Sequence, residues 1–370
     1  MKAKVRRESF PAGRRIIAVS DIHGNYEYFS GLLKKLSFSP EDILVIPGDM
    51  VDKGPDSLSV LRLIMHMCEA GNVYPLCGNC DCWHELFDRT PVTSYAGLKT
   101  GGRLRDFLCE RRRGSLIAQM CGEVGFEISS NMDMGKMLDV IREPFRAEFD
   151  FLRSLPTIID TEYYTFVHGG LPGTDLDDLE AHSCMKFDDF LSHAGTFDKW
   201  CIVGHWPVML YGQRRTQANP IIDTARHIVS IDGGCCLKDD GQLNALIIPE
   251  YGNSDFGFEY YDPFPLYRVV TPQTESSDSF YIRWGDNVVR VLDPGTEFSR
   301  CMHVRTGYVM DILTKFLRRD GDTVTCNDCT DYEPGLSSGD IVALVEETSR
   351  GYMIKHNGVS GWYRGTLEAL

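Results

Sequence analysis

Metal-binding side chains follow five strand-like segments of this sequence, each time close to a glycine. They are Asp21, His23, Asp49, Asn79, His168 and His205. Imidazole nitrogens, carboxylates and amide oxygens suit ions such as Mn, Fe or Zn. Two such ions about 3.5–4 Å apart activate water and stabilise the oxygens of an in-line phosphoryl displacement. The residue types therefore predict a two-metal site, with a shared carboxylate, for phosphoryl chemistry.

Strands and helices must alternate along the chain to bring these residues together. The predicted strands are residues 16–19, 43–46, 73–76, 164–167 and 201–203. Residues 26–36 and 58–68 carry apolar side chains at helical spacing. Because open α/β sheets bind ligands at the carboxyl ends of their strands, we expect the polar side chains at one edge. The sequence thus predicts an α/β fold.

The composition is that of an ordinary globular protein, with 43% hydrophobic and 25% charged residues in a chain of 370. Its net charge of −15 opposes extended nucleic-acid binding, because an acidic surface repels phosphate backbones. No apolar run reaches the roughly 18 residues typical of a membrane span, and the basic N-terminus lacks the apolar stretch of a signal peptide. Thirteen scattered cysteines suit reduced thiols. We therefore expect a cytoplasmic protein without a membrane partner.

After residue 250 the alternation of strands and helices gives way to a proline-containing, polar stretch and then to short segments of alternating apolar and polar residues. Residues 1–270 are predicted to form the α/β domain, with a helical insert at about 98–155, and residues 280–370 a small all-β barrel that resembles bacterial SH3-like domains. The polar stretch between them is expected to be a linker. Two interpretations apply to Tyr352, Trp362 and Tyr363: a groove for a peptide or protein partner, or packing in the domain's core.

The ordered blocks SDIHGN, GDMVDKG, GNCD, HGG and GHWP closely resemble the signature of the phosphoprotein phosphatase branch of the calcineurin-like metallophosphoesterases, in its bacterial serine/threonine phosphatase-like form. The resemblance covers about residues 14–250. It implies a four-layer α/β/β/α metallophosphoesterase sandwich with the site above one edge. It also implies that a metal-bound hydroxide attacks the phosphoryl group, so that no covalent phospho-enzyme forms.

The resemblance implies a role for each of the six side chains. Asp21 and His23 would hold the first metal, and Asp49 would bridge both metals. The second metal would be held by Asn79, His168 and His205. Lys53 and Asn79 are the expected phosphate contacts. The cofactor would be two divalent ions, among Mn, Fe, Zn and Ni, which all tolerate such ligands.

The phosphate-binding positions depart from the family pattern. Lys53 stands where the family has an arginine, and lysine keeps the charge but loses the two-pronged hydrogen bond. The family's second phosphate-binding arginine falls between the HGG and GH blocks. The sequence has no arginine between His168 and His205, so Lys186 and Lys199 are the only cations there. Each is either a phosphate ligand or an ordinary surface lysine.

Cys80 occupies the position where most family members have the histidine that protonates the leaving oxygen. Asp52, which would orient that histidine, is retained. Nearby metal ions favour the thiolate of Cys80, which cannot donate a proton. Aryl phosphates and phosphoanhydrides, which need no acid, should therefore react faster than alkyl phosphates. His84, one helical turn beyond Cys80, is an alternative acid.

The cysteines also allow a zinc knuckle. Cys77 and Cys80 have the C-x-x-C spacing, as do Cys326 and Cys329. Structural zinc sites place the second pair roughly 12–20 residues after the first, so the wide separation disfavours this interpretation.

Three functions follow from these observations. The leading hypothesis is a dinuclear metal-dependent phosphatase for phosphomonoesters, with phosphoserine or phosphothreonine in proteins as the expected substrate. The second is a hydrolase of nucleotide phosphoanhydrides such as dinucleoside tetraphosphates, which Cys80 and Lys53 modestly favour. The third is a phosphate-binding scaffold with weak activity, and the intact ligand set argues against it.

Overall fold

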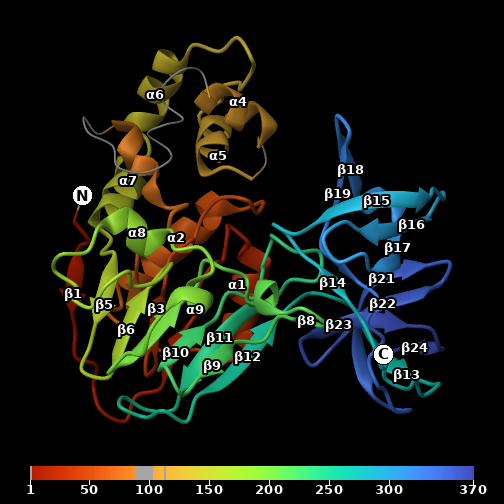
Figure 1. The fold of residues 1–370 in the computed structure, drawn as a ribbon. Coiled ribbons are helices and arrows are strands. Elements are labelled where there is room, and N and C mark those ends of the chain that lie inside the picture. Colours follow the sequence, from red (N-terminus) through yellow and green to blue (C-terminus); the bar gives the residue numbers. More distant parts are fainter. Residues whose placement is uncertain (1, 88–102, 112–113) are drawn as a thin grey trace. The chain divides into compact units, whose positions relative to one another are not determined.

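The computed structural model describes residues 2–87, 103–111 and 114–370 (Figure 1). The chain divides into two compact units. Unit 1 comprises Met1–Pro207, Asn219–Leu237 and Gly241–Asp262, and unit 2 comprises Val208–Ala218, Lys238–Asp240 and Pro263–Leu370. The second unit thus includes two short segments from the middle of the chain. The boundary near residue 270 that the sequence predicts would assign both segments to the first domain.

Unit 1 contains a five-stranded sheet with the strand order β12-β11-β2-β3-β4. Its strands are β2 (Ile16–Ala18), β3 (Ile43–Ile46), β4 (Val73–Pro75), β11 (Leu243–Ile248) and β12 (Gly257–Tyr261). Strands β2, β3 and β4 are parallel, and β11 is antiparallel to both β2 and β12. The carboxyl ends of the three parallel strands therefore meet at one edge.

A second, six-stranded sheet of unit 1 has the order β1-β5-β6-β7-β10-β9. Its strands are β1 (Val5–Arg7), β5 (Ile158–Asp160), β6 (Tyr164–Val167), β7 (Trp200–Val203), β9 (Ile221–Asp223) and β10 (Ile228–Ser230). Strands β6, β7 and β10 are parallel, so this sheet also brings the carboxyl ends of three strands to one edge.

The alternation of side chains along the strands explains how the layers pack. Ile16 and Ala18 share a buried cluster with Phe166 and Ile202 of the other sheet, whereas Ile17 belongs to a cluster formed with helices. The helices of unit 1 are α1 (Tyr26–Lys35), α2 (Ser57–Cys68), α4 (Arg103–Glu110), α5 (Leu116–Glu123), α6 (Met134–Arg142), α7 (Arg146–Ser154), α8 (Ala181–Met185) and α9 (Phe190–His193), with the 3-10 turn η1 (Cys82–Phe87). The predicted α/β fold is confirmed.

Helices α4 to α7 form the segment predicted as a helical insert, of which residues 98–102 and 112–113 lie outside the described residues. No helix in the described part of the chain is both long and apolar enough to cross a membrane.

Unit 2 is all-β apart from the turns η2 (Val208–Tyr211) and η3 (Thr314–Phe316). One sheet has the order β24-β13-β21-β22-β23-β8, another β17-β16-β15-β19-β18, and β14 pairs with β20. The strands are β8 (Thr216–Gln217), β13 (Leu266–Val269), β14 (Tyr281–Ile282), β15 (Val288–Asp293), β16 (Phe298–His303), β17 (Val309–Leu313), β18 (Leu317–Asp320), β19 (Thr323–Cys326), β20 (Cys329–Thr330), β21 (Ile341–Thr348), β22 (Gly351–His356), β23 (Val359–Tyr363) and β24 (Leu367–Ala369).

The closed barrel predicted for this region is not present among the described residues, whose sheets are open. Alternation of apolar and polar residues predicts strands, but closure also requires the first and last strands to pair. Here β8 and β24 are the two ends of their sheet. The SH3-like character of unit 2 therefore stays a prediction.

The stretch predicted as a linker pairs within unit 2, and the core-packing interpretation of the aromatic side chains holds for Trp362 and Tyr363. Gln273 exchanges two backbone hydrogen bonds with Leu336, so the polar stretch belongs to unit 2. Trp362 is 7% exposed and Tyr363 is 0% exposed. The Trp362 indole donates to the Thr330 carbonyl at 2.8 Å. These two side chains therefore pack in the core. The hydrogen bond of the indole is typical of a buried Trp, whose N–H needs a partner there.

Candidate metal centre

The predicted ligands follow the carboxyl ends of parallel strands in both sheets of unit 1. After β2, β3 and β4 come Asp21 and His23, Asp49, and Asn79, and after β6 and β7 come His168 and His205. Asp21, His23, Asp49 and His168 are at most 1% exposed. Two sets of parallel strands thus deliver the predicted side chains to one buried centre.

Asp49 lies in the middle of this centre. Its Oδ1 is 3.3 Å from His168 Nε2, and its Oδ2 is 3.8 Å from His23 Nε2. His23 Nε2 is also 3.7 Å from Asp21 Oδ1. The centre contains two groups of three side chains whose possible ligand atoms lie within 4.8 Å of one another inside each group. One group is His23, Asp49 and Cys80, and the other is Asp49, His168 and His205. Asp49 belongs to both groups, as a bridging carboxylate must.

Hydrogen bonds from outside the centre orient the three imidazoles. His168 Nδ1 lies 2.8 Å from the Pro47 carbonyl oxygen, and His23 Nδ1 lies 3.5 Å from the Val51 carbonyl oxygen. His205 Nε2 lies 2.7 Å from Asp188 Oδ1. Histidines that bind metals typically donate their second N–H to a carbonyl or carboxylate, which fixes the ring and its tautomer. The other nitrogen of each ring is then available as a ligand.

Several polar atoms of the centre have no hydrogen-bond partner among the described residues, although they are buried. They include Asp21 Oδ1, Asn79 Oδ1 and His168 Nε2, whose 3.3 Å contact with Asp49 Oδ1 does not have the geometry of a hydrogen bond. Buried polar atoms are nearly always paired. Ligands bound at roughly 2.1 Å around one ion lie roughly 3–3.5 Å apart, which is near the spacing of 3.3–3.8 Å between the ligand atoms here. The residues present therefore fit divalent metal ions.

The backbone is strained at the same residues. Positive φ angles occur at Asp21 (57°), His23 (50°), Asp49 (51°), Asp52 (68°), Lys53 (71°) and His205 (67°). Each such non-glycine residue costs about 1–3 kcal/mol and persists only where the surroundings fix it. Gly78 permits the close approach of two loops, because a Cβ there would lie 2.3 Å from the Asp49 backbone nitrogen. Strain concentrated on chemically active residues indicates a functional site.

Opposite charges dominate the electrostatics of the centre. Burial alone would raise the pKa of Asp49, but the neighbouring His168, His23 and Lys53 hold that pKa well below its ordinary value. Burial alone would lower the pKa of His168, and the carboxylates of Asp49 and Asp21 raise it to about 10 instead. The centre therefore attracts positive charge, which metal ions also supply.

Cys80 lies where an acid for the leaving group was expected. Its backbone N–H donates to Asp49 Oδ1 at 2.7 Å. Burial, and then the charge of Asp49, raise the pKa of its thiol well above the ordinary value. In the protein alone Cys80 is thus a neutral thiol, whereas the sequence predicts a thiolate because it presumes bound metal ions.

The Asp52 carboxylate accepts two hydrogen bonds from groups outside the predicted ligand set. Its Oδ2 accepts a hydrogen bond from the Trp83 indole at 2.8 Å, and its Oδ1 accepts one from the Leu116 backbone N–H at 2.8 Å. The carboxylate therefore ties its loop to η1 and α5. Its expected part in orienting a leaving-group acid stays a prediction.

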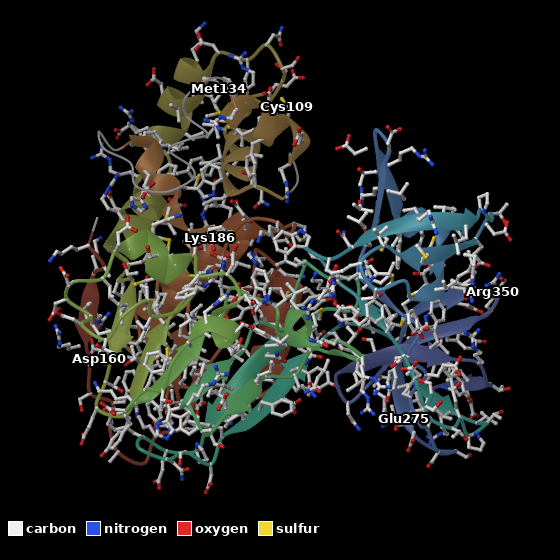
Figure 2. The ribbon with its side chains drawn as sticks, viewed as in Figure 1. Cys109, Met134, Asp160, Lys186, Glu275 and Arg350 are labelled. Atoms are coloured by element: carbon white, nitrogen blue, oxygen red, sulfur yellow. The ribbon has the colours of Figure 1, made fainter. Side chains whose placement is uncertain are left out.

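The three candidate phosphate-binding lysines have different environments. Lys53 Nζ lies 3.4 Å from His23 Nε2, inside the centre. Lys186 Nζ lies 3.2 Å from Asp188 Oδ1, the same oxygen that contacts His205 (Lys186 is labelled in Figure 2). Lys199 instead contacts both oxygens of Asp160, at 2.8 and 3.0 Å. Lys186 is therefore the better placed of the two lysines between the histidine blocks.

The remaining sulfur and histidine candidates separate in space. The Sγ atoms of Cys77 and Cys82 lie 3.5 Å apart, whereas Cys80 groups with His23 and Asp49. Cys326 and Cys329 in unit 2 have sulfur atoms 3.9 Å apart. His84 lines a small cavity beside Cys77 and Cys82. The contacts of Cys77 and Cys80 do not support a shared zinc knuckle.

Sequence reasoning missed three acidic residues of the centre. Asp188 carries no sequence signal, and its contact with His205 lowers its pKa to about 2. Asp81 accepts hydrogen bonds from the backbone N–H groups of Met50 (3.0 Å) and Gly78 (2.9 Å), so it joins two ligand-bearing loops. Asp232 follows β10 and has a buried, unpartnered Oδ2 among the described residues. The strand-end rule that identified Asp49 would also have found Asp232.

A buried set of imidazole, carboxylate and amide groups at the edge of two sheets is an arrangement typical of metal sites in α/β proteins. The family model described as Calcineurin-like phosphoesterase matches residues 14–252, and the chain belongs to this family. The resemblance predicted from the motifs is confirmed.

Two relatives illustrate the range of the family. Serine/threonine-protein phosphatase 2 of Escherichia coli (strain K12) is 50% identical over 52 residues, which are 14% of this chain and 24% of that protein. The asymmetrical bis(5'-nucleosyl)-tetraphosphatase PrpE of Halalkalibacterium halodurans is 32% identical over 242 residues, which are 63% of this chain and 89% of that protein. These names describe hydrolases of phosphoric ester and anhydride bonds.

Other matches are more limited. The chain spans 46% of the Bacillus subtilis tetraphosphatase PrpE, at 33% identity. A solved serine/threonine phosphatase from Saccharomyces cerevisiae is 12% identical with a TM-score of 0.44, and the overlap covers 70% of this chain and 83% of that one.

Proposed function

We propose that this protein is a dinuclear metal-dependent phosphatase. The observation that carries the proposal is the central position of Asp49, whose carboxylate belongs to both ligand groups of the centre. The buried, unpartnered Asp21 Oδ1, Asn79 Oδ1 and His168 Nε2 support it, because metal ions would satisfy these atoms. Two divalent ions, among Mn, Fe, Zn and Ni, are the proposed cofactor.

The protein's own residues would divide the remaining work. Asp21 and His23 would hold one ion, Asn79, His168 and His205 the other, and Asp49 both. Bound metals at such a site activate water and stabilise the oxygens of the transferring phosphoryl group. Lys53 and Asn79 would bind phosphate oxygens, and we assign Lys186 to the same task because of its contact with Asp188.

The proposed substrate is a phosphomonoester, with phosphoserine or phosphothreonine in a protein as the leading candidate. The second candidate is a nucleotide phosphoanhydride of the dinucleoside tetraphosphate type. Cys80 favours the second candidate, because it replaces an acid that an alkoxide leaving group needs and an anhydride does not. The 32% identity over 242 residues to a tetraphosphatase supports the same choice. We also propose a cytoplasmic location.

The test is to reconstitute the protein with each metal, determine its metal content by elemental analysis, and follow the hydrolysis of p-nitrophenyl phosphate. Two ions per chain and multiple turnovers are expected. Phosphopeptide and dinucleoside tetraphosphate assays then compare the two substrate classes by kcat/KM. A protein that binds two ions and phosphate without turnover would be a scaffold, and the proposal would be wrong.

A further inference from the structure

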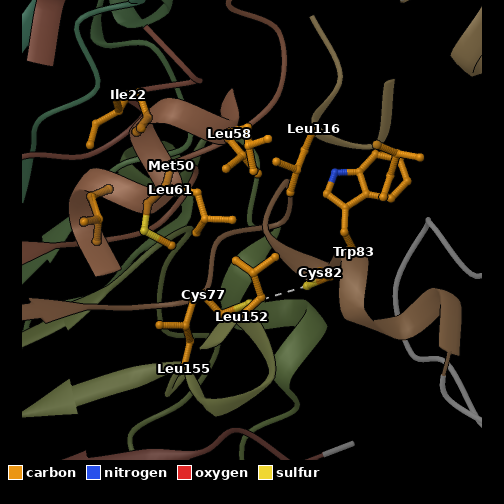
Figure 3. Close-up of a cluster of buried hydrophobic side chains, with 14 of the residues drawn as sticks. Ile22, Met50, Leu58, Leu61, Cys77, Cys82, Trp83, Leu116, Leu152 and Leu155 are labelled. Atoms are coloured by element: carbon orange, nitrogen blue, oxygen red, sulfur yellow. Dashed lines mark hydrogen bonds between the residues drawn. The ribbon is translucent and has the colours of Figure 1, made fainter. Parts of the chain in front are cut away.

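The sulfur atoms of Cys77, Cys82 and Met185 lie close together, and the two cysteines flank Asn79 in the sequence. Cys77 Sγ lies 3.5 Å from Cys82 Sγ, and Cys82 Sγ lies 3.9 Å from Met185 Sδ (Figure 3 shows the two cysteines). The Gly78 carbonyl oxygen completes the group, at 3.5 Å from Cys77 Sγ and 3.6 Å from Cys82 Sγ. We call these three side chains and this carbonyl the sulfur cluster.

The spacing of the sulfur cluster is that of ligands around one ion. Tetrahedral ligands with bonds of about 2.3 Å lie roughly 3.8 Å apart. The contacts between the two cysteines, between each cysteine and the Gly78 carbonyl, and between Cys82 and Met185 measure 3.5–3.9 Å. A disulfide has a sulfur–sulfur distance of about 2.05 Å, so both cysteines are free thiols, as are the other cysteines of the described chain.

The chemistry of these donors differs from that of the metal centre. Thiolates and thioethers are soft ligands that select Cu(I) or other thiophilic ions, whereas carboxylates, imidazoles and amide oxygens suit harder divalent ions. Because the sulfur cluster offers three sulfur atoms and one carbonyl, it should bind a different ion from the one bound by the neighbouring centre.

The cluster is also accessible to an ion of this size. Cys77, Cys82 and Met185 line a cavity of about 50 Å³, which is large enough for one water molecule or ion. Lys2, Lys4 and Arg153 line the same cavity together with one acidic residue, Glu85, so positive charges predominate there. Their positive charges would offset the negative charge that two thiolates and one monovalent ion leave.

We propose that Cys77, Cys82 and Met185 form a binding site for a soft, thiophilic cation, with Cu(I) as the ion that fits best. Binding would displace the two thiol protons to solvent, without a change in the oxidation state of the ion. Two other thiol pairs, Cys235 with Cys236 and Cys326 with Cys329, have sulfur atoms 3.9 Å apart. In the sulfur cluster, a methionine sulfur also lies 3.9 Å from one cysteine of the pair.

The test is an anaerobic titration of the reduced full chain with Cu(I), after the hard-metal centre has been loaded with Mn²⁺. A competing Cu(I) chelator of known affinity reports the dissociation constant. We expect one Cu(I) per chain at the cluster, about 100-fold weaker binding in Cys77→Ser and in Cys82→Ser, and about 10-fold weaker binding in Met185→Leu. X-ray absorption at the copper edge should show sulfur ligands.

The double variant Cys326→Ser, Cys329→Ser is the matched control, because it removes a thiol pair outside the sulfur cluster and should leave the tight site intact. Wild-type affinity in Cys77→Ser, Cys82→Ser would overturn the proposal, and so would copper bound through nitrogen alone. If a cysteine variant fails to fold by circular dichroism, unchanged affinity in Met185→Leu overturns it instead. None of these measurements depends on phosphatase activity, so the proposed function is tested separately.

Discussion

Asp49 is the proposed bridge of the metal centre, because its two carboxylate oxygens approach the histidines of both groups. We expect Asp49→Asn to lower the metal content below two ions per chain and to reduce kcat by at least about 100-fold, since an amide bridges two cations poorly. Elemental analysis and p-nitrophenyl phosphate hydrolysis check both effects. Full metal content with full activity in the variant would contradict the assignment of Asp49 as the bridge.

In the proposed mechanism, Cys80 limits which leaving groups the centre can use, because it replaces a proton donor. We expect Cys80→His to raise the rate on an alkyl phosphate by at least about 10-fold more than on an aryl phosphate, because a positioned acid assists only poor leaving groups. The measurement is kcat/KM for both substrates with matched metal content. If kcat/KM changed by the same factor for both substrates, proton donation at this position would not limit the departure of the leaving group. Cys80→Ser is the control, since serine adds no acid near neutral pH.

Lys186 and Lys199 form a matched pair for the phosphate contact. Lys186→Met should raise KM for phosphate esters and the inhibition constant of inorganic phosphate by about 10-fold, because one charge-assisted contact is lost. Lys199→Met should leave both constants unchanged, since Lys199 is held by Asp160. Steady-state kinetics with product inhibition distinguishes the two variants. Identical constants for them would remove Lys186 from the phosphate site.

At the scale of the elements, Arg15 and Asp42 join the starts of neighbouring strands. Arg15 precedes β2 and donates to both oxygens of Asp42, which precedes β3, at 2.8 Å each. The Ser39 backbone N–H donates to Asp42 Oδ2 at 2.9 Å. Burial would raise the pKa of Asp42, but the bonds from Arg15 and Ser39 lower it below its ordinary value.

Because the folded state lowers this pKa, the pair stabilises the protein above the unfolded pKa of about 4 and loses that effect as the pH falls through the folded pKa. We expect Asp42→Asn to cost about 1–3 kcal/mol of unfolding free energy at pH 7, and less at pH 3, where the carboxylate begins to be protonated. Urea unfolding at both pH values measures the difference.

Glu41→Gln is the matched control for this experiment. Glu41 is paired with Arg14 at 3.6 Å and its side chain is 88% exposed, so its loss should be nearly neutral at either pH. A cost for Asp42→Asn that is the same at pH 3 as at pH 7 would show that the carboxylate charge is not the source of the stability.

At the scale of the whole molecule, residues 208–218 depend on the C-terminal part of the chain. Strand β8 pairs with β23, and the Arg283 guanidinium donates to the Gly212 carbonyl at 2.6 Å. A protein cut at residue 270 would lose these partners. We expect residues 1–270 to be less soluble than the full chain and to unfold at least about 5 °C lower, as measured by calorimetry or circular dichroism. An equal melting temperature would show that the first domain is stable without residues 271–370.

The sequence predicted much of unit 1 because its signals are local. The strands at 16–18, 43–46 and 164–167 are apolar and β-branched, and their ends carry Asp21, Asp49 and His168 beside glycines. A rule that reads strand ends along the chain is enough to collect such ligands. Unit 2 was predicted less well, because alternation in β22 and β23 indicates strands but not the partners that close or open a sheet.

By itself the sequence determined the α/β class, the ligand types and the family of this protein. Residue types, hydrophobic periodicity and the order of the motifs can all be identified without knowledge of which segments pack together. Only the tertiary structure decided that Asp188 supports His205, that Asp52 contacts Trp83, and that Cys82 meets Met185. Cys82 and Met185 are 103 residues apart in the sequence, and no local pattern encodes such a contact. Contacts of this kind arise when folding packs separate segments together. The sequence therefore determines which side chains are available, and the tertiary structure determines which of them are in contact.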